Sequence, residues 1–403
     1  MPDDERLVTG YGGRLLLAVS VGWMFIQAGR LVVSPLLPEI STTYGLTPTQ
    51  EGFAVTTIWG VYALLQYPSG RLSDRLTRTT LLVAGLVAVV VGFLLLAVAP
   101  SYPAFLFGAV VVGVGAGLYP TPARGLVSDL FVERRGQAFG LHTASGDLGG
   151  IAAAGLSVAA LAVAGYAAGL PDALAALARL GWRTAFLPVV LVLAGVALSL
   201  HVWSREGYRL ASVDLEVAAT ARRLLGRPGL RRLVVAYALY AFVWQSATGL
   251  LPTFLRRAKS FSPGVAAAGF ATLFVVGAVV KPLAGGLGDR VARDRLAPAV
   301  LALAAVALGW VVVAESPTAV TLGVVVFAAG LMAYPPVMQA YLMDTFPDDS
   351  MAGDLGGMRS VYIGLGALGP TVVGAVGGFA GYGVGFAGLA ACLLVAGALV
   401  LTS

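Results

Sequence analysis

Three basic residues lie inside long apolar stretches of the sequence, where a charge is costly: Arg30, Arg124 and Lys281. An ionised side chain in the core of a bilayer costs at least about 3 kcal/mol, so such a residue either faces a polar cavity or sits in an ion pair. Arg30 lies about 16 residues, or roughly 24 Å of helix, into its stretch. We therefore expect Arg30 to face a cavity and bind an anion, with a structural ion pair as the alternative.

One acid, Asp147, lies near the middle of an apolar stretch, five residues after His142. Burial disfavours the charged form of a carboxyl group, whereas a nearby cation favours it. With Arg30 or His142 as its neighbour, Asp147 could change its affinity for a proton when an anion binds or leaves. The alternative is a fixed Asp–Arg pair. Arg124 lies near the end of its stretch, and we expect it to form a gate or an interfacial ion pair with Asp129, Glu133 or a facing acid.

The elements that must position these residues are apolar helices. The 403 residues are 58% hydrophobic and 11% charged, whereas soluble domains carry about 25% charged residues. The 53 glycines are typical of membrane helices, because small residues let helices approach closely in lipid. A membrane span needs about 20 apolar residues, so twelve spans with short loops account for the chain. The composition predicts an all-α integral membrane protein.

The twelve apolar runs divide into two groups of six. We expect residues 1–203 to form an N-terminal six-helix bundle, 204–232 a cytoplasmic central linker, and 233–403 a C-terminal six-helix bundle. Eighteen basic residues fall on one side of the membrane and five on the other, and the positive-inside rule then puts both termini in the cytoplasm. The runs are 14–37, 50–69, 80–99, 103–128, 137–165, 183–203, 233–254, 263–284, 296–314, 317–343, 357–379 and 381–402.

The two groups of six share landmarks at a nearly constant spacing. The polar loop GRLSDRLTR at 70–78 has a counterpart, GGLGDRVAR, at 285–293, and Tyr119-Pro120 has a counterpart at 334–335, both 215 residues later. The glycines at 146 and 149 match those at 366 and 369. Landmarks in the same order at such a spacing indicate an internal duplication. Duplicated halves of this kind usually enclose a substrate site near the middle of the membrane.

A Gly/Asp/Arg loop between the second and third spans resembles the signature loop of the major facilitator superfamily, and its second copy fits that family's duplicated halves. The resemblance implies the MFS fold, with twelve transmembrane helices in two pseudo-symmetric six-helix bundles. It places Tyr119, Gln245 and Tyr334 in spans that line the substrate cavity, although packing explains each of them as well as ligand contact does. It also implies that the two loops act as a gating latch, with these candidate residues: Gly70, Asp74, Arg75, Arg78, Gly285, Asp289 and Arg290.

The segment that begins at Lys281-Pro282 resembles the monocarboxylate and oxalate porters, which carry a basic residue, usually arginine, at this place and another near the position of Arg30. The resemblance implies that Arg30 and Lys281 contact a small carboxylate, although lysine offers a point charge and not a bidentate grip. The GDLGG segment at 146–150 resembles the Gly-Asn-x-Gly-Gly motif of nitrate porters, with Asp in place of Asn. The GALGP segment at 366–370 resembles a glycine-proline motif of drug–proton antiporters.

The function that these features favour is secondary active transport by alternating access, with proton-coupled symport of a small, monocarboxylate-like anion across the plasma membrane. An exporter of drugs or amphiphiles is the alternative, and a nitrate porter or a non-transporting sensor is less favoured. The expected partners are the substrate anion, protons and lipid, and we expect a monomer without cofactor, metal or nucleic acid. Two histidines without metal-ligand spacing argue against a membrane enzyme.

Overall fold

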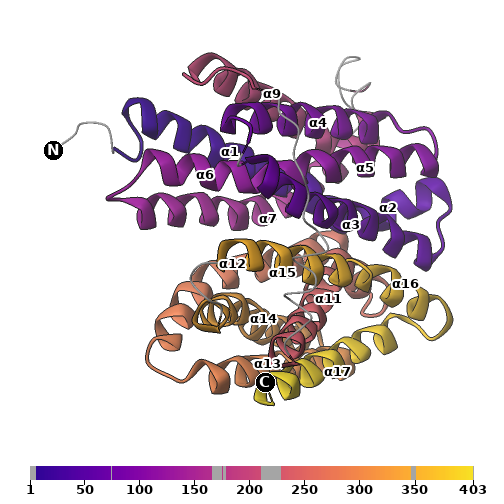
Figure 1. The fold of residues 1–403 in the computed structure, drawn as a ribbon. Helices are drawn as coiled ribbons and strands as arrows, with labels where there is room; N and C mark the ends of the chain where they lie inside the picture. Colours follow the sequence, from indigo (N-terminus) through magenta and orange to yellow (C-terminus); the bar gives the residue numbers. More distant parts are fainter. Residues whose placement is uncertain are drawn as a thin grey trace. The chain divides into compact units, whose positions relative to one another are not determined.

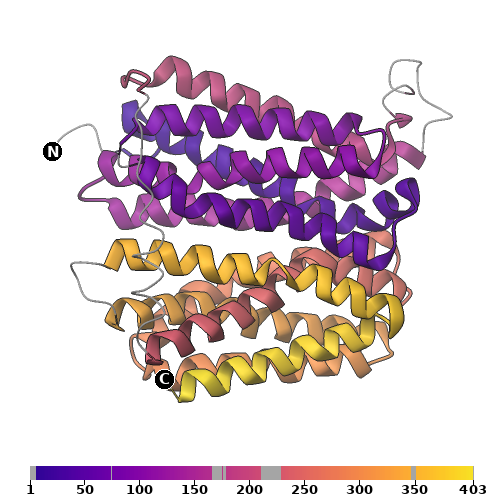
Figure 2. The ribbon, with the colours of Figure 1, turned by 45° about the vertical axis from the view of Figure 1, so that its right-hand side comes forward.

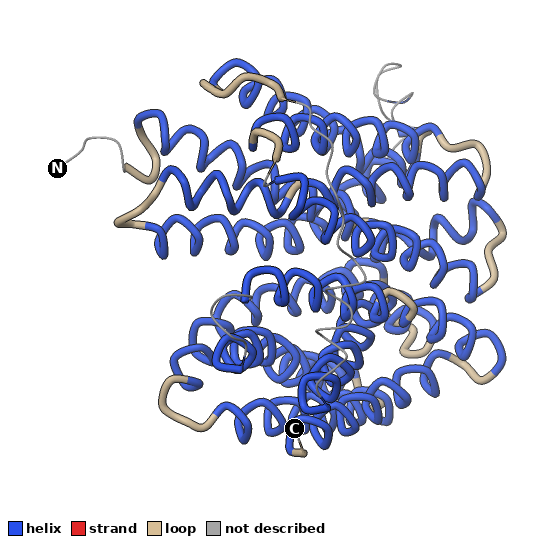
Figure 3. The backbone as a smooth tube through the Cα atoms, viewed as in Figure 1, coloured by secondary structure: helices blue, strands red, loops and turns tan. Residues whose placement is uncertain are grey.

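The computed structural model describes residues 6–73, 75–165, 175, 178–209, 228–345 and 351–402, with backbone only for 228, 343–345 and 351–356. Among these residues the regular structure is helical throughout, as Figure 3 shows. Eleven of the described helical segments are long and apolar enough to cross a membrane. The predicted second span is absent from those eleven. It corresponds to α3 (Pro48–Ser73), which has 26 residues but carries buried polar side chains, among them Glu51 and Gln66.

The chain forms two compact units. Unit 1 comprises Met1–Glu39 and Leu64–Leu215, and unit 2 comprises Ile40–Ala63 and Glu216–Ser403. The segment 40–63, which the sequence analysis assigns to the N-terminal bundle, therefore packs with the C-terminal helices. Helix α11 begins at Pro228, inside the stretch expected to be the linker. Most of that linker, residues 210–227, lies outside the described residues.

The helices of unit 1 pack in pairs around α1 and α4. Helix α1 packs on α7 and α9, and α4 packs on α5 and α9 (Figure 1 and Figure 2). The helices with residues in unit 1 are α1 (Gly10–Leu31), α2 (Val33–Tyr44), α3, α4 (Arg78–Val98), α5 (Tyr102–Leu118), α6 (Pro120–Leu130), α7 (Arg135–Gly165), the 3-10 helix η2 (Gly181–Ala185) and α9 (Phe186–Trp203).

Unit 2 repeats this pairing with the helices of the second half. Helix α11 packs on α15 and α17 as α1 does on α7 and α9, and α13 packs on α14 and α17 as α4 does on α5 and α9. The helices are α11 (Pro228–Arg257), α12 (Pro263–Gly288), α13 (Arg293–Val313), α14 (Pro317–Thr345), α15 (Met351–Gly366), α16 (Gly369–Phe379) and α17 (Tyr382–Leu401). The common pairing supports the predicted duplication.

The matched glycines allow two helices to pack closely in both units. A Cβ atom on Gly146 or Gly149 would lie 2.5 Å from the Trp23 ring or 2.4 Å from the Met24 carbonyl of α1. In unit 2 a Cβ atom on Gly366 or Gly369 would lie 2.7 or 2.5 Å from α11 backbone atoms. In each unit, therefore, the first and fifth spans touch through their backbones.

Prolines leave helix carbonyls without their usual donors, and side chains from neighbouring helices replace them. The Leu118 carbonyl, whose helical donor would be the missing N–H of Pro122, accepts from Ser69 Oγ at 3.0 Å. The Leu331 carbonyl has the same defect because residue 335 is proline, and it accepts from Tyr240 Oη at 3.0 Å. The first of the two Tyr-Pro motifs breaks the chain into α5 and α6, whereas the second lies inside α14.

The C-terminal end of α13 is closed by a lysine from another helix of unit 2. Lys259, just after α11, donates to the carbonyls of Val312 and Ala314 at 2.7 and 2.6 Å. The last carbonyls of a helix lack intrahelical donors, and a cation is favoured at this end of the helix dipole. Lys259 therefore serves as a cap.

Candidate functional site

Arg30 lies deep inside unit 1, and its binding of an anion stays a prediction. Its side chain is 4% exposed, on the last turn of α1, and Nη1 donates to Gln27 Oε1 at 3.1 Å. This hydrogen bond orients the guanidinium on α1. Helix α7 crosses α1 beside Gln27, since a Cβ on Gly149 would lie 2.8 Å from the Cβ of Gln27.

The predicted proton-coupling pair lies on α7 of the same unit. His142 is 2% exposed, its ring centroid is 6.4 Å from that of Trp23, and its Nδ1 has no hydrogen-bond partner among the described residues. Asp147 is half-buried one and a half turns further on. Arg124 of α6 lies within electrostatic range of His142. Helix α7 thus carries His142, Asp147 and the glycines that meet α1.

Tyr119 stands at the break between α5 and α6 and is fully buried. Its ring stacks on Trp23 at a centroid distance of 6.4 Å and an interplanar angle of 4°, and its hydroxyl donates to the Val19 carbonyl at 2.9 Å. Both interactions join it to α1. A substrate contact by Tyr119 stays a prediction.

Unit 2 contains a cluster of four tyrosines: Tyr237 and Tyr240 of α11, Tyr334 of α14 and Tyr362 of α15. The Tyr237 and Tyr362 rings stack at 3.9 Å, and Tyr334 lies 5.5 Å from Tyr237 and 4.6 Å from Tyr240 by ring centroids. Tyr334 is fully buried, yet its hydroxyl has no partner among the described residues. The predicted residue Gln245 is near, because its Nε2 donates to the Ile363 carbonyl at 2.9 Å.

The cation beside this cluster is Arg359, at the start of the predicted run 357–379 and one of the eighteen basic residues expected on the cytoplasmic side. The structure places it about two turns into α15, half-buried. Its side chain shares a hydrogen bond with Tyr62 of α3, and Tyr237 and Tyr362 lie within electrostatic range. Its Nε atom is buried without a hydrogen-bond partner. No carboxylate of the described side chains forms an ion pair with it.

Lys281, the other predicted substrate residue, is half-buried on α12, with Leu283 exposed beside it. Helix α12 packs on α11 and α14, the two helices that carry three of the four tyrosines. A site shared by Lys281 and the tyrosine cluster stays a prediction.

The two signature loops are each closed by an arginine at the start of the following helix. Arg78 donates to the Ser73 carbonyl at 2.6 Å and its Nε lies 3.3 Å from Asp129 Oδ2 of α6. Arg293 lies 215 positions later. It donates to the Gly288 carbonyl at 3.1 Å and pairs with Asp289 at 3.1 Å. The partner of Asp289 in this loop is thus Arg293.

Three other loop candidates, Arg75, Asp289 and Arg290, are exposed, and Asp74 lies outside the described residues. The glycines Gly70 and Gly285 lie within α3 and α12, and an added Cβ on either would meet nothing within 4 Å. The observed contacts make each loop a locally closed helix–turn–helix. A role in gating stays a prediction.

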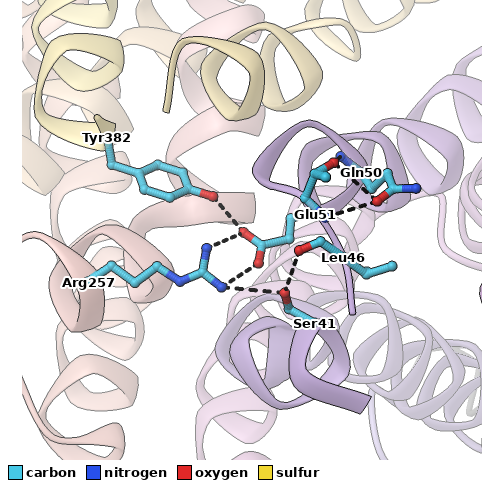
Figure 4. Close-up of polar contacts among 7 residues, drawn as sticks. Ser41, Leu46, Gln50, Glu51, Arg257 and Tyr382 are labelled. Carbon is cyan, nitrogen blue, oxygen red and sulfur yellow. Dashed lines mark hydrogen bonds and ion pairs between the residues drawn. The ribbon is translucent and has the colours of Figure 1, made fainter. Parts of the chain in front are cut away.

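A buried ion pair in unit 2 has no counterpart in the sequence analysis (Figure 4). Glu51, on the first turn of α3, is 0% exposed and accepts from Arg257 of α11, with Nη1 at 3.0 Å and Nη2 at 2.5 Å. The Tyr382 hydroxyl of α17 donates to the same carboxylate at 2.6 Å. One sequence signal exists: Glu51 shares an i, i+4, i+8 stripe with Val55 and Trp59, where an apolar residue is the norm.

The sequence model described as Major Facilitator Superfamily matches residues 19–352 and 233–403. The uncharacterized MFS-type transporter YwfA of Bacillus subtilis (strain 168) is 29% identical over 136 residues, 33% of each chain. SauU of Cupriavidus necator, named a probable sulfoacetate transporter, is 26% identical over 65% of this chain and 61% of its own length. A probable 4-methylmuconolactone transporter of Cupriavidus pinatubonensis is 30% identical over 43% of this chain and 39% of its own.

Solved structures share the fold. The bacterial homologue of the human lysosomal transporter Spinster, in its inward-facing and unoccupied conformation, superposes with a TM-score of 0.84 at 20% identity, covering 98% of this chain and 97% of that one. The D-xylose–proton symporter superposes with a TM-score of 0.74 at 15% identity, covering 97% of each. The family match over most of the sequence and the helical fold show that this chain belongs to the Major Facilitator Superfamily, as a multi-pass membrane transporter of small molecules and not an enzyme.

Proposed function

We propose that this protein carries a small organic anion across the plasma membrane by proton-coupled alternating access, with both termini in the cytoplasm. The observation that carries the proposal is one arginine in an apolar helix of each unit, the buried Arg30 in α1 and the half-buried Arg359 in α15. A neutral polar side chain shares a hydrogen bond with each of them, Gln27 with Arg30 and Tyr62 with Arg359. A guanidinium binds a carboxylate or sulfonate through paired, charge-assisted hydrogen bonds.

Two of the relatives are named as probable transporters of small organic anions. Sulfoacetate carries a carboxylate and a sulfonate group, and the muconolactone carries one carboxylate. Both are compact anions with an uncharged body. In unit 2 the tyrosine rings could hold such a body by packing. The hydroxyl of Tyr334 and the Nε of Arg359, which have no hydrogen-bond partner in the described part of the chain, could bind its oxygens.

We place the coupled proton on Asp147, with His142 as its neighbour on α7. An anion that binds near Arg30 would draw the positive charge away from this carboxylate. The Asp147 carboxylate would then hold a proton more firmly when the anion is bound than when the site is empty, which couples the two movements.

The first test is a thermal-shift screen of purified protein against sulfoacetate, monocarboxylates, nitrate and lipophilic cations. A ligand that binds only the folded state at about 100 times its Kd stabilises it by about 2.7 kcal/mol. A small organic anion should raise the melting temperature, and Arg30→Gln or Arg359→Gln should weaken its binding roughly 10- to 100-fold, the effect of a lost charge-assisted hydrogen bond. Arg14→Gln, at an exposed position of α1, is the matched control.

Transport is then measured in proteoliposomes with the anion that the screen finds. Asp147→Asn should keep substrate exchange and lose accumulation driven by a proton gradient. Uptake that is unchanged in both arginine variants would contradict the anion site. Stabilisation by lipophilic cations alone would favour the drug exporter.

A further inference from the structure

The first residues after α9, 204–209, lie against the beginning of α4 within unit 1. Thr77 Oγ1 donates to the Gly207 carbonyl at 3.0 Å, and the backbone N–H of Arg209 donates to Thr80 Oγ1 at 3.1 Å. Hydrogen bonds from two threonines of one helix end therefore fix the path of this segment. We name residues 204–209 the collar.

The collar separates its charged side chains. Its acid, Glu206, turns toward α4, where Oε2 accepts from the N–H and the hydroxyl of Thr79, both at 3.4 Å. The positive end of the helix dipole favours a carboxylate at this place. The two arginines, Arg205 and Arg209, are exposed, and within the described part of the chain neither forms an ion pair. The exposed side chains of the collar therefore attract anions.

Tyr11 of α1 fixes the position of Arg205. The Arg205 backbone N–H donates to Tyr11 Oη at 3.2 Å, and its guanidinium carbon lies 4.1 Å from the centre of the Tyr11 ring. A guanidinium that lies over a ring uses its flat face, so that the N–H groups at its edge can still bind an anion. Those groups donate to no acceptor among the residues that the structure describes. Arg205 is thus both oriented and available.

An apolar face of α9 ends beside the collar. Leu191, Leu198 and Val202 are 73%, 63% and 66% exposed, and their spacing places them on one face of the helix. From the first to the last of them the helix rises by roughly 16 Å, close to the thickness of about 15 Å that one leaflet gives to a bilayer core. Trp203 and Tyr208, also exposed, follow at the end of this face, and aromatic rings of this kind are enriched at the level of lipid headgroups.

We propose that the collar and the exposed face of α9 bind an anionic phospholipid of the phosphatidylglycerol class. The phosphate would accept paired hydrogen bonds from the edge of the Arg205 guanidinium, and Arg209 would add attraction at longer range. An acyl chain would lie along Leu198 and Val202.

Two other ligands fit these features less well. A zwitterionic lipid would bring its quaternary ammonium group close to two unpaired arginines, Arg205 and Arg209, where like charges repel. A free phosphate ion would use Arg205 but leave the apolar face of α9 without a role. The combination of basic and apolar groups therefore favours an anionic lipid.

Native mass spectrometry of the full-length protein in detergent tests the proposal. The protein is mixed with equal amounts of dioleoyl phosphatidylglycerol and dioleoyl phosphatidylcholine, and the lipids that stay bound are identified by mass. The parent should retain phosphatidylglycerol in preference to phosphatidylcholine. Arg205→Gln should reduce this preference roughly fivefold, the effect of one arginine beside an anionic headgroup. Arg231→Gln, exposed on the first turn of α11, is the matched control and should keep the preference.

Two more variants test how Arg205 is held. Arg205→Lys keeps the charge but loses the paired donors, so it should restore part of the preference and not all of it. Tyr11→Leu keeps both arginines of the collar but removes the ring below Arg205, and it should lower the preference as well. Full retention in Tyr11→Leu would contradict the part that we give to this ring.

A competition experiment separates a lipid from a free phosphate. Glycerol phosphate has the phosphate group without the chains, so at the same concentration it should not displace phosphatidylglycerol from the parent. Displacement would overturn the proposal in favour of a free-phosphate site. Equal retention of both lipids by the parent, or an equal loss in Arg205→Gln and Arg231→Gln, would overturn it as well. None of these residues belongs to the proposed substrate site, so the result does not depend on the proposed function.

Discussion

Removal of Arg257 should damage the protein more than removal of Glu51. Arg257→Met leaves an ionised carboxylate that is 0% exposed, with Tyr382 as its remaining strong donor, and the cost of breaking a buried pair in this way is about 3–5 kcal/mol. Glu51→Gln leaves a guanidinium that is 37% exposed and can be hydrated, so it loses about 1–2 kcal/mol of hydrogen bonding.

These values can be read from melting curves of the purified protein. For a unit of about 200 residues, 1 kcal/mol corresponds to roughly 2–4 °C. We expect the apparent Tm to fall by roughly 10 °C in Arg257→Met and by roughly 4 °C in Glu51→Gln at neutral pH. The double variant should melt near the Glu51→Gln protein, since it buries no unpaired charge.

The two single variants and the double variant together check this reasoning. Equal losses in the two single variants, or a double variant that loses the sum of both, would show that the buried charge is not what makes Arg257 important.

Three further predictions concern packing and hydrogen bonds. Gly149→Leu should lower the folded yield in size-exclusion chromatography, by overpacking worth about 1–3 kcal/mol; Gly140→Leu on the same helix, where an added Cβ meets nothing within 4 Å, should not. Arg78→Ala should lower the melting temperature by an amount equivalent to about 1–2 kcal/mol. The substitution removes both the donor to the Ser73 carbonyl and the ion-pair partner of Asp129. Tyr334→Phe should keep full stability but weaken anion binding. Tyr240→Phe should instead lose about 1 kcal/mol of stability. Melting curves and the ligand-binding assay are measured for both variants.

The duplication, the helical class and most of the span positions follow from the sequence because they depend on local pattern. Tyr-Pro motifs, paired glycines and polar loops recur about 215 residues apart, and each pair has equivalent neighbours in the structure. The sequence did not assign a particular role to Arg293. Its contact with the Gly288 carbonyl was still predictable, because Arg78 stands in the same place of the first loop.

The charged contacts between distant helices could not be predicted in the same way. Glu51 and Arg257 are 206 residues apart, and no local periodicity relates them. Arg257 is one of the five basic residues predicted for the outer side, and Arg359 one of the eighteen predicted for the cytoplasmic side, because both lie near the ends of apolar runs. Burial at such a position depends on which helix covers it, and that is a property of the tertiary structure.

The lysines of this chain have a practical consequence. The sequence has two, Lys259 and Lys281, and the amine of Lys259 is engaged by two carbonyls at the end of α13. An amine-reactive dye must break this cap before it can react there. Mild acylation should therefore modify Lys259 only slowly while the end of α13 stays folded, which would make this lysine a reporter on that helix end without introducing any new residue.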